Sequence, residues 1–267
     1  MPHFEDQVII VTGASEGIGR ALCLALAAQR PKLVVAARNV ERLESLKAEV
    51  EAAGAQALVV PTDVTDETAC RELIEAAVAA YGGIDVLVCN AGGTMWTTFE
   101  AIRDLSIFER LMRLNYLSAV YCSYHALPHL KARQGLLVGV ASVAGLCGVP
   151  ARTAYAASKH AMFGFFNSLR VELAEAGVAV SMVAPDFVLS EIHRRALDGE
   201  GRPLGASPLQ EDKIMTAEEC AAMMVRAMER RERLLITSAR GRMGRWLQLV
   251  APAMMDRIAA KAIREAK

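Results

Sequence analysis

A tyrosine and a lysine four residues apart, Tyr155 and Lys159, are the residues of this sequence best suited to acid–base chemistry. On a helix, side chains at positions i and i+4 share one face, so these two groups are expected to lie side by side. The positive charge of the lysine favours phenolate over phenol and is expected to lower the tyrosine pKa from about 10 towards neutral pH, where proton exchange is most efficient. We therefore expect Tyr155 to act as a general acid and base.

Two further polar residues complete a candidate catalytic set. Ser142 follows the apolar run 136–140, and Asn115 lies within a stretch with a helical pattern. Each has a simpler interpretation when taken alone, because a serine after a strand usually belongs to a turn and an asparagine within a helix often makes only a local hydrogen bond. Their occurrence together with Tyr155 and Lys159 favours catalysis.

A glycine-rich segment, Thr12–Arg20, directly follows the first apolar run and leads into a helical pattern. Glycine permits a tight turn and lets backbone N–H groups approach a pyrophosphate, while the helix N-terminus adds partial positive charge. Such a cluster is weak evidence alone, but its place between a strand and a helix favours a dinucleotide site. The expected cofactor-binding residues of this segment are Gly13, Ser15, Glu16, Gly17, Ile18 and Gly19.

The second predicted strand leads to Arg38, near the position where folds specific for NAD carry an acid that binds the adenosine ribose. A planar guanidinium suits a 2′-phosphate instead, and the Ser15 hydroxyl is placed to donate to the same group. The sequence therefore predicts NADP(H) as the cofactor. The alternative is that Arg38 merely begins a solvated helix face with Glu41 and Arg42.

The elements that must position these groups are short apolar runs alternating with longer amphipathic stretches. The predicted strands are 8–11, 33–36, 57–60, 86–88, 136–140, 178–183 and 234–237. The predicted helices are 19–29, 40–53, 67–81, 107–131, 155–176 and 217–230. This alternation indicates an α/β fold, a doubly wound, Rossmann-like parallel β-sheet of about seven strands with helices on both faces.

Residues 1–267 are expected to form a single domain, because doubly wound sheets commonly fill this length with one core. Residues 191–213 are rich in glycine and proline and have no periodic apolar face. Long irregular segments in compact domains are usually functional. This insertion is therefore predicted to be a substrate loop that acts as a lid.

Composition excludes several classes of function. Thirty basic residues balance thirty acidic ones, so no overall field attracts nucleic acid. The six cysteines form no CxxC pair and no His/Cys spacing suited to zinc, so we expect buried thiols, no metal site and a cytoplasmic location. No apolar run reaches the ~18 residues of a membrane span.

The motifs occur in an order that resembles the short-chain dehydrogenase/reductase family. The resemblance covers residues 8 to about 190 and rests on the spacing of Gly13, Gly17 and Gly19, Asn90-Ala91-Gly92, Asn115, Ser142, and Tyr155-Ala-Ala-Ser-Lys159. Any one of these motifs can arise by chance, but five motifs in this order and at these intervals hardly can. The residues before Asn115 and the extended C-terminal end look more like the hydroxysteroid dehydrogenase and ketosphinganine reductase branches than small sugar reductases.

The resemblance implies a catalytic tetrad of Asn115, Ser142, Tyr155 and Lys159 on a Rossmann-like fold. In the family, the lysine also binds the nicotinamide ribose, the serine holds the substrate oxygen, and the asparagine helps to hold a water for proton relay. The further cofactor contacts implied are Asp63, Val64, Asn90, Ala91, Gly92, Tyr155, Lys159, Pro185, Val188 and Ser190. The family usually has Pro-Gly after the sixth strand, and Asp186, which tolerates a left-handed backbone, replaces that glycine here.

The implied reaction is hydride transfer between the nicotinamide and a carbonyl or secondary alcohol of a small molecule. Apolar residues in the expected substrate segments favour a hydrophobic substrate: Met95, Trp96, Phe99, Leu146, Val149, Phe187 and Ile192. The resemblance also implies a homo-oligomer, a dimer or tetramer, built through helices 107–131 and 155–176. Two other classes stay open, namely a non-catalytic NADP-binding regulatory protein and a membrane-surface interaction protein.

The C-terminal residues 240–267 contain seven basic and two acidic residues, an excess of five positive charges in a neutral chain. Apolar residues recur at helical spacing, so a basic amphipathic extension is predicted. The favoured interpretation is packing against its own or a partner subunit near the active-site mouth, and the alternative is peripheral contact with a membrane. The residues that distinguish burial in protein from exposure to lipid are Trp246, Leu249, Met254 and Met255.

Overall fold

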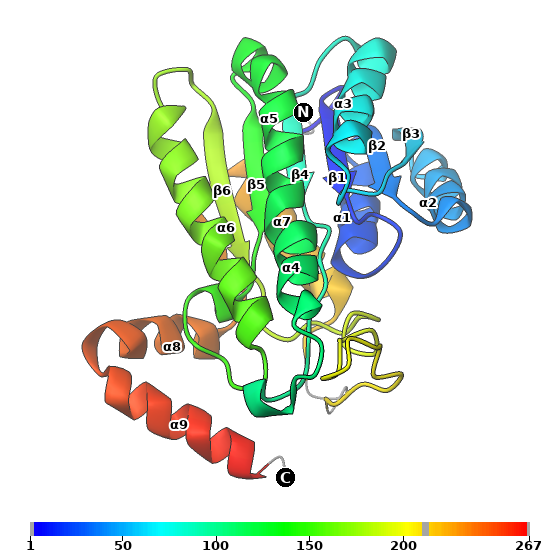
Figure 1. Cartoon of the computed structure of the whole chain (residues 1–267). Helices are drawn as coiled ribbons and strands as arrows, with labels where there is room; N and C mark the ends of the chain where they lie inside the picture. Colours follow the sequence, from blue (N-terminus) through cyan, green and yellow to red (C-terminus); the bar gives the residue numbers. More distant parts are fainter. Residues whose placement is uncertain (1–2, 210–213, 266–267) are drawn as a thin grey trace.

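The computed structural model describes residues 3–209 and 214–265. Its centre is a parallel sheet with strand order β3-β2-β1-β4-β5-β6-β7 (Figure 1). The strands are β1 (Val8–Thr12), β2 (Lys32–Ala37), β3 (Gln56–Pro61), β4 (Val86–Cys89), β5 (Leu136–Val140), β6 (Ala179–Ala184) and β7 (Leu234–Ile236). The predicted seven-stranded parallel sheet is confirmed, with small shifts at the strand ends.

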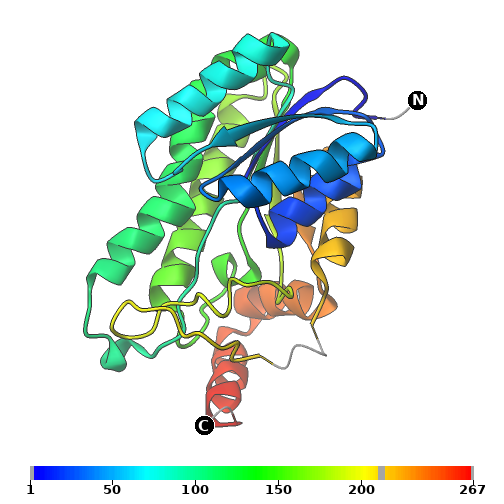
Figure 2. The same ribbon diagram turned by 90° about the vertical axis from the view of Figure 1, so that its right-hand side faces the viewer.

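Helices cover both faces of the sheet, as Figure 2 shows from the side. The principal helices are α1 (Gly17–Ala27), α2 (Val40–Ala52), α3 (Glu67–Tyr81), α4 (Ser106–Met112), α5 (Ser118–Arg133), α6 (Thr153–Glu172) and α7 (Ala217–Glu229). α1, α2 and α7 bury apolar residues on one face, and α3, α5 and α6 on the other. Because successive residues of a strand face opposite sides, Val11 of β1 joins the first core and Ile10 the second.

The strand order reverses between β1 and β4. β1 pairs with β2 on one side and with β4 on the other, while the chain runs outward to β3 in one direction and to β7 in the other. The loops that follow β1 and β4 therefore diverge to opposite faces. Such a point leaves a crevice at the carboxyl edge of an open α/β sheet, where ligands bind.

The predicted helix 107–131 is not continuous. α4 and α5 are separated by a π-helical turn, η2 (Arg113–Leu117), which contains Asn115. A π turn inserts one residue into the helical repeat and is frequent at functional sites. The apolar pattern of the sequence predicted one helix because a single inserted residue hardly changes that pattern.

The C-terminal extension forms two helices, α8 (Ala239–Val250) and α9 (Pro252–Glu265), beyond the carboxyl edge of the sheet (Figure 1). Trp246, Leu249 and Met254 are 68%, 69% and 47% exposed. Met255 is half-buried. In the single chain these three side chains are exposed, and Leu249 also lines a small pocket with Leu146 and Phe163.

The predicted insertion lies beside the same edge of the sheet. Its described part, 191–209, contains turns and isolated bridges that pair Leu197 with Met95 and with Pro203. Positions 210–213 of the prediction lie outside the described residues. Within the described chain, no helix has both the length and the apolar character needed to cross a bilayer.

Candidate functional site

A cavity of about 900 Å³ lies at the carboxyl edge of the sheet, where the strand order reverses. The predicted cofactor-binding residues that line it are Gly13, Ser15, Glu16, Gly17, Ile18, Arg38, Asp63, Val64, Asn90, Ala91, Gly92, Pro185, Val188 and Ser190. Ser142, Tyr155 and Lys159 line the same cavity. Gly19 and Asn115 are buried outside its lining. Residues predicted from separate motifs therefore converge on one space.

The glycine turn after β1 needs its glycines for both conformation and packing. Gly13 and Gly17 have left-handed φ values of +67° and +54°. A β-carbon on Gly19 would lie 2.4 Å from the carbonyl oxygen of Gly13, and one on Gly13 would lie 2.8 Å from the Cα of Ala91. The turn consequently fits closely against the loop after β4. Its backbone faces the cavity as binding of a pyrophosphate requires.

Thr12 and Asn90 hold these two loops together. The Thr12 hydroxyl oxygen accepts hydrogen bonds from the backbone N–H groups of Asn90 (3.0 Å) and Ala91 (3.1 Å). The Asn90 side-chain amide donates to the carbonyl oxygens of Thr12 (2.9 Å) and Gly13 (3.3 Å). Asn90 therefore shapes the glycine turn as well as lining the cavity. Sequence reasoning missed Thr12, because a threonine that ends a buried strand carries no signal of its own.

Glu16 precedes α1, but its side chain does not cap that helix. Its carboxylate instead forms ion pairs with Arg42 of α2 and, at 2.6 Å, with Arg195 of the 191–209 segment. The backbone N–H groups of the first turn of α1 thus have no side-chain cap and suit a phosphate group. The sequence could not predict the contact with Arg195, which lies 179 positions away.

Arg38 and Asp63 lie at the end of the cavity expected to hold the adenosine. Arg38 is exposed at the end of β2. Burial acts to raise the pKa of Asp63, but hydrogen bonds from the backbone N–H and hydroxyl of Thr65, together with the charge of Arg38, lower it. Asp63 is therefore a carboxylate at neutral pH. Arg38, the residue predicted to bind a 2′-phosphate, lines this end of the cavity.

Tyr155 has its hydroxyl beside that of Ser142, and burial rather than a neighbouring cation dominates its acidity. Desolvation raises the pKa of Tyr155, while a hydrogen bond with Ser142 and the charge of Arg152 partly oppose the rise. The expectation that Lys159 lowers this pKa below its usual value is therefore wrong for this structure. The physical reason is that the tyrosine is 7% exposed, so a phenolate would be poorly hydrated.

Lys159 lies on the same face of α6, as its i+4 spacing predicted. Its Nζ donates to the carbonyl oxygen of Val140 at 3.0 Å and lies 5.9 Å from the Tyr155 ring centroid. Burial lowers the pKa of Lys159 from 10.5 to about 7. The amine is consequently only partly charged at neutral pH, which explains its small influence on the tyrosine.

Asn115 lies on the π turn, outside the cavity lining. Its side-chain oxygen accepts from the N–H of Gly93 at 2.8 Å, and its amide donates to the Gly93 carbonyl at 3.0 Å and to Ser158 Oγ at 2.8 Å. Ser158 lies between Tyr155 and Lys159 on α6. Asn115 therefore joins the loop after β4 to the helix that carries the tyrosine and lysine.

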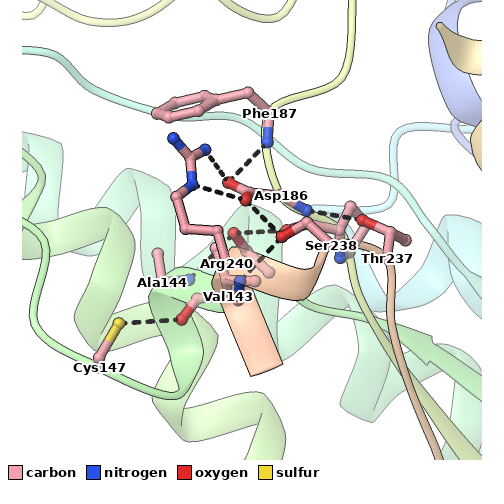
Figure 3. Close-up of polar contacts among 11 residues, drawn as sticks. Val143, Ala144, Cys147, Asp186, Phe187, Thr237, Ser238 and Arg240 are labelled. Atoms are coloured by element: carbon pink, nitrogen blue, oxygen red, sulfur yellow. Dashed lines mark hydrogen bonds and ion pairs between the residues drawn. The ribbon is translucent and has the colours of Figure 1, made fainter. Parts of the chain in front are cut away.

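The segment after β6 is fixed by Asp186, which takes the place of the glycine usual in the resembling family (Figure 3). Its carboxylate accepts from Ser238 Oγ at 2.6 Å and from Nη2 and Nε of Arg240 at 2.8 and 3.1 Å. Asp186 does not have a positive φ, so the left-handed backbone considered for it is not needed. The aspartate instead ties the segment after β6, which lines the cavity, to α8.

The predicted apolar lining is only partly assembled. Val149, Phe187 and Ile192 line the cavity, together with Met255 of α9. Phe99 is 63% exposed and Leu146 lines a separate pocket. No group of three His, Cys, Asp or Glu side chains suited to a metal occurs in the described parts of the chain.

Comparisons with known proteins agree with this geometry. The family model "short chain dehydrogenase" matches residues 7–201. A relative named dehydrogenase/reductase SDR family protein 7-like, from Dictyostelium discoideum, is 32% identical over 95% of this chain and 80% of its own length. An 11-beta-hydroxysteroid dehydrogenase from Pinus massoniana is 35% identical over 83% of this chain, which covers 64% of that protein.

Two solved structures share the fold. A short-chain dehydrogenase/reductase from Burkholderia phymatum in complex with NAD has a TM-score of 0.84, with 25% identity over 95% of this chain and 96% of its own. An alcohol dehydrogenase from the archaeon Thermococcus sibiricus complexed with 5-hydroxy-NADP has a TM-score of 0.75, with 25% identity over 87% of this chain and 96% of its own. The glycine turn, the uncapped α1 and the cavity fit a nicotinamide dinucleotide.

Lys159→Met should raise the melting temperature most at low pH. Below about pH 7 the lysine is charged in both the folded and the unfolded state, so the folded state bears the full cost of burying an ammonium group. Between pH 7 and 10.5 the folded lysine loses its proton first, and that cost declines. We expect a gain of at least about 3 °C near pH 6 that fades towards pH 10.

Thermal unfolding followed by circular dichroism at both pH values measures this effect. Lys131→Met is the control, because Lys131 is exposed on α5. A difference from the wild type that does not change with pH would show that the pKa of Lys159 is not lowered by burial.

Proposed function

Because the chain belongs to the short-chain dehydrogenase family, we propose that it is an NADP(H)-dependent oxidoreductase acting on a carbonyl or secondary alcohol of a largely hydrophobic small molecule. The observation that carries the proposal is the convergence of Ser142, Tyr155 and Lys159 in one cavity with the glycine turn. When bound, the nicotinamide donates or accepts the hydride. Carbonyl-reducing and alcohol-oxidising chemistry both need a proton donor or acceptor at the substrate oxygen, and Tyr155 supplies it.

Burial shifts the pKa values of Tyr155 and Lys159 in opposite directions, so the side chains have different tasks in the proposed reaction. The raised pKa of Tyr155 keeps the phenol protonated at neutral pH, which suits donation to a carbonyl oxygen. The Ser142 hydroxyl, adjacent to the phenol, orients the same oxygen. Lys159, with a pKa of about 7, can take up or release a proton near the working pH. By resemblance to the family, it also binds the nicotinamide ribose. A regulatory protein that only binds NADP would not require Ser142, Tyr155 and Lys159 together.

The preference for NADP(H) rests on charge at the adenosine end of the cavity. Arg42 and Arg195 form ion pairs with Glu16. Arg38 is exposed, and among the described residues it has no ion pair, although its charge acts on Asp63. A guanidinium with free donors suits a phosphate monoester. Ser15 in the glycine turn lines the same cavity and offers a hydroxyl for the same phosphate.

Tyr155→Phe should lower turnover by at least about a hundredfold while leaving cofactor affinity nearly unchanged, because only the proton donor is removed. The measurement is NADPH oxidation with a panel of ketones, accompanied by NADPH fluorescence titration. Tyr124→Phe serves as the control, since Tyr124 is 72% exposed on α5. Turnover close to that of the wild type would refute the assignment.

Arg38→Asp should reverse the cofactor preference, because the substitution removes a phosphate partner and adds a repelling charge. The wild type is expected to bind NADPH more tightly than NADH, and the variant the reverse, as measured by fluorescence titration. Arg71→Asp, on the distant helix α3, should leave the preference as it is. Equal affinities of the wild type for the two cofactors would contradict the proposal.

A second candidate function, contact with a membrane surface, is favoured by the exposed apolar residues of α8 and α9. We propose that the protein is cytoplasmic and forms a homo-oligomer. The basic helices α8 and α9 would then lie at the substrate entrance, because Gly244 and Met255 line the cavity. Full-length protein should co-sediment with anionic vesicles and not with neutral ones. The double variant Trp246→Ser/Leu249→Ser should lose binding to the anionic vesicles. Val171→Ser is the control and should keep it, because Val171 of α6 is at least as exposed.

The same experiment separates lipid contact from subunit contact. Sedimentation velocity without vesicles gives the oligomeric state of the wild type and of the double variant. Dissociation of the double variant into monomers, without any vesicle binding by the wild type, would assign these side chains to a subunit interface and remove the membrane proposal.

A further inference from the structure

Arg152 is a buried cation in the wall of the cavity. The residue is 6% exposed, and its Nη2 atom has no hydrogen-bond partner. Within the described residues, no carboxylate lies within ion-pair distance of its guanidinium. A buried charged group without a partner is costly, so natural proteins seldom retain one unless a ligand completes it.

The guanidinium is held in place by aromatic rings. Its Cζ lies 4.2 Å from the centroid of Trp96 and 5.1 Å from that of Phe187. Stacking on aromatic faces attracts a cation without occupying its N–H donors, which point outward in the plane of the group. The two rings therefore help to hold the guanidinium, while its Nη2 atom is left without a hydrogen-bond partner among the described residues.

The charge of Arg152 persists at neutral pH. Burial lowers its pKa to about 10, against the opposing effects of Tyr155 and Asp186. Asp186, the acid whose charge acts on it, is itself hydrogen-bonded to Arg240 and Ser238. The protein thus maintains a charged guanidinium here and commits the nearby carboxylate to a different arginine.

The residue before Arg152 has an unusual backbone conformation. Ala151 has a φ of +59°, a left-handed conformation that a residue with a β-carbon seldom adopts. Its carbonyl oxygen accepts a hydrogen bond from Thr97 N–H at 2.9 Å, next to Trp96. Strain of this kind persists where the surrounding structure imposes it, and it clusters at binding sites.

We propose that Arg152 binds an oxyanion of the substrate, a carboxylate or a phosphate ester, close to the reacting carbonyl. This inference rests on the proposed oxidoreductase function and names the substrate class. The Cζ of Arg152 lies 5.8 Å from the ring centroid of Tyr155, so an anion on Arg152 and an oxygen on the Tyr155 hydroxyl belong to neighbouring parts of one molecule. The substrate is an oxo acid or a ketone with an adjacent phosphate ester, carrying an apolar chain along Val149 and Ile192.

The charge of the whole cavity agrees with an anionic substrate. Its lining contains eight arginine and lysine residues and three aspartate and glutamate residues, although the chain as a whole is neutral. A cavity lined by one sign of charge concentrates ligands of the opposite sign. The dinucleotide phosphates use the end near Arg38, whereas Arg152 lies at the opposite end, beside Tyr155.

The test compares matched substrates that differ only in the anion. One arm uses a long-chain 3-oxo acid and its amide, and the other a hydroxyketone phosphate and the free hydroxyketone, each assayed with NADPH. In at least one arm the wild type should prefer the charged member by at least tenfold in kcat/KM. The arm that shows the preference identifies carboxylate or phosphate as the oxyanion.

Arg152→Met should bring that ratio close to one, chiefly by raising KM for the charged member, and Arg152→Lys should retain part of it. Arg226→Met, on the exposed side of α7, is the matched control and should keep the wild-type ratio. An equal ratio in the wild type and Arg152→Met, or a wild-type preference for the neutral members, would overturn the proposal.

Binding is measured separately from turnover, so that the two proposals fail in different ways. In a Trp246→Phe background Trp96 is the one remaining tryptophan, and it lies against Arg152. With NADP+ bound, the charged ligand should change its fluorescence saturably, and Arg152→Met should abolish the change. Saturable binding without turnover would refute the oxidoreductase and leave the oxyanion site standing. Turnover of neutral ketones without saturable binding of the charged ligand would refute the oxyanion site and leave the oxidoreductase proposal standing.

Discussion

Burial of ionisable groups at the carboxyl edge of the sheet is the constraint on which the site depends. Tyr155 and Lys159 are both nearly inaccessible to solvent, and burial raises the pKa of the first and lowers that of the second. Each shift favours the neutral form, because a phenolate or an ammonium group loses its hydration there. The result is a neutral phenol beside an amine that titrates near neutral pH, a pair suited to passing a proton. In an open, hydrated cleft the same residues would keep a charged lysine and an ordinary tyrosine.

Keeping these groups dry and aligned requires loops that do not move relative to one another. The loops after β1, β4, β5 and β6 meet here, and each is joined to a neighbour through a polar side chain and a backbone group. Thr12 and Asn90 join the first two, and Asn115 joins the second to α6. Ser142 Oγ donates to the Pro185 carbonyl at 3.3 Å, which joins the last two. Bonds of this kind satisfy loop backbone that would otherwise be buried without partners.

The sequence predicted the sheet and the line of motifs well because both are local patterns. Apolar β-branched runs identify strands, and the i, i+4 spacing of Tyr155 and Lys159 places them on one helical face wherever that helix lies. The π turn at Asn115, the contact between Glu16 and Arg195, and the ion pair between Asp186 and Arg240 are different. They depend on which segments meet in space, and no local pattern specifies that. The acidity of Tyr155 was mispredicted for the same reason, since the degree of burial is a property of the assembled cavity.

Asp186 shows how a single departure from the family pattern reorganises one end of the site. A glycine in its place would have no side chain to hold the C-terminal helices, whereas the carboxylate binds the hydroxyl and guanidinium at the start of α8. Its neighbour Phe187 contacts two arginines, with Cζ of Arg152 at 5.1 Å and of Arg240 at 5.5 Å from the ring centroid. The substrate end is therefore bounded by a cluster of Trp96, Arg152, Phe187 and Arg240 of α8. Because Phe187 contacts both Arg152 and Arg240 of α8, the shape of the substrate end depends on the C-terminal helices as well as on the sheet.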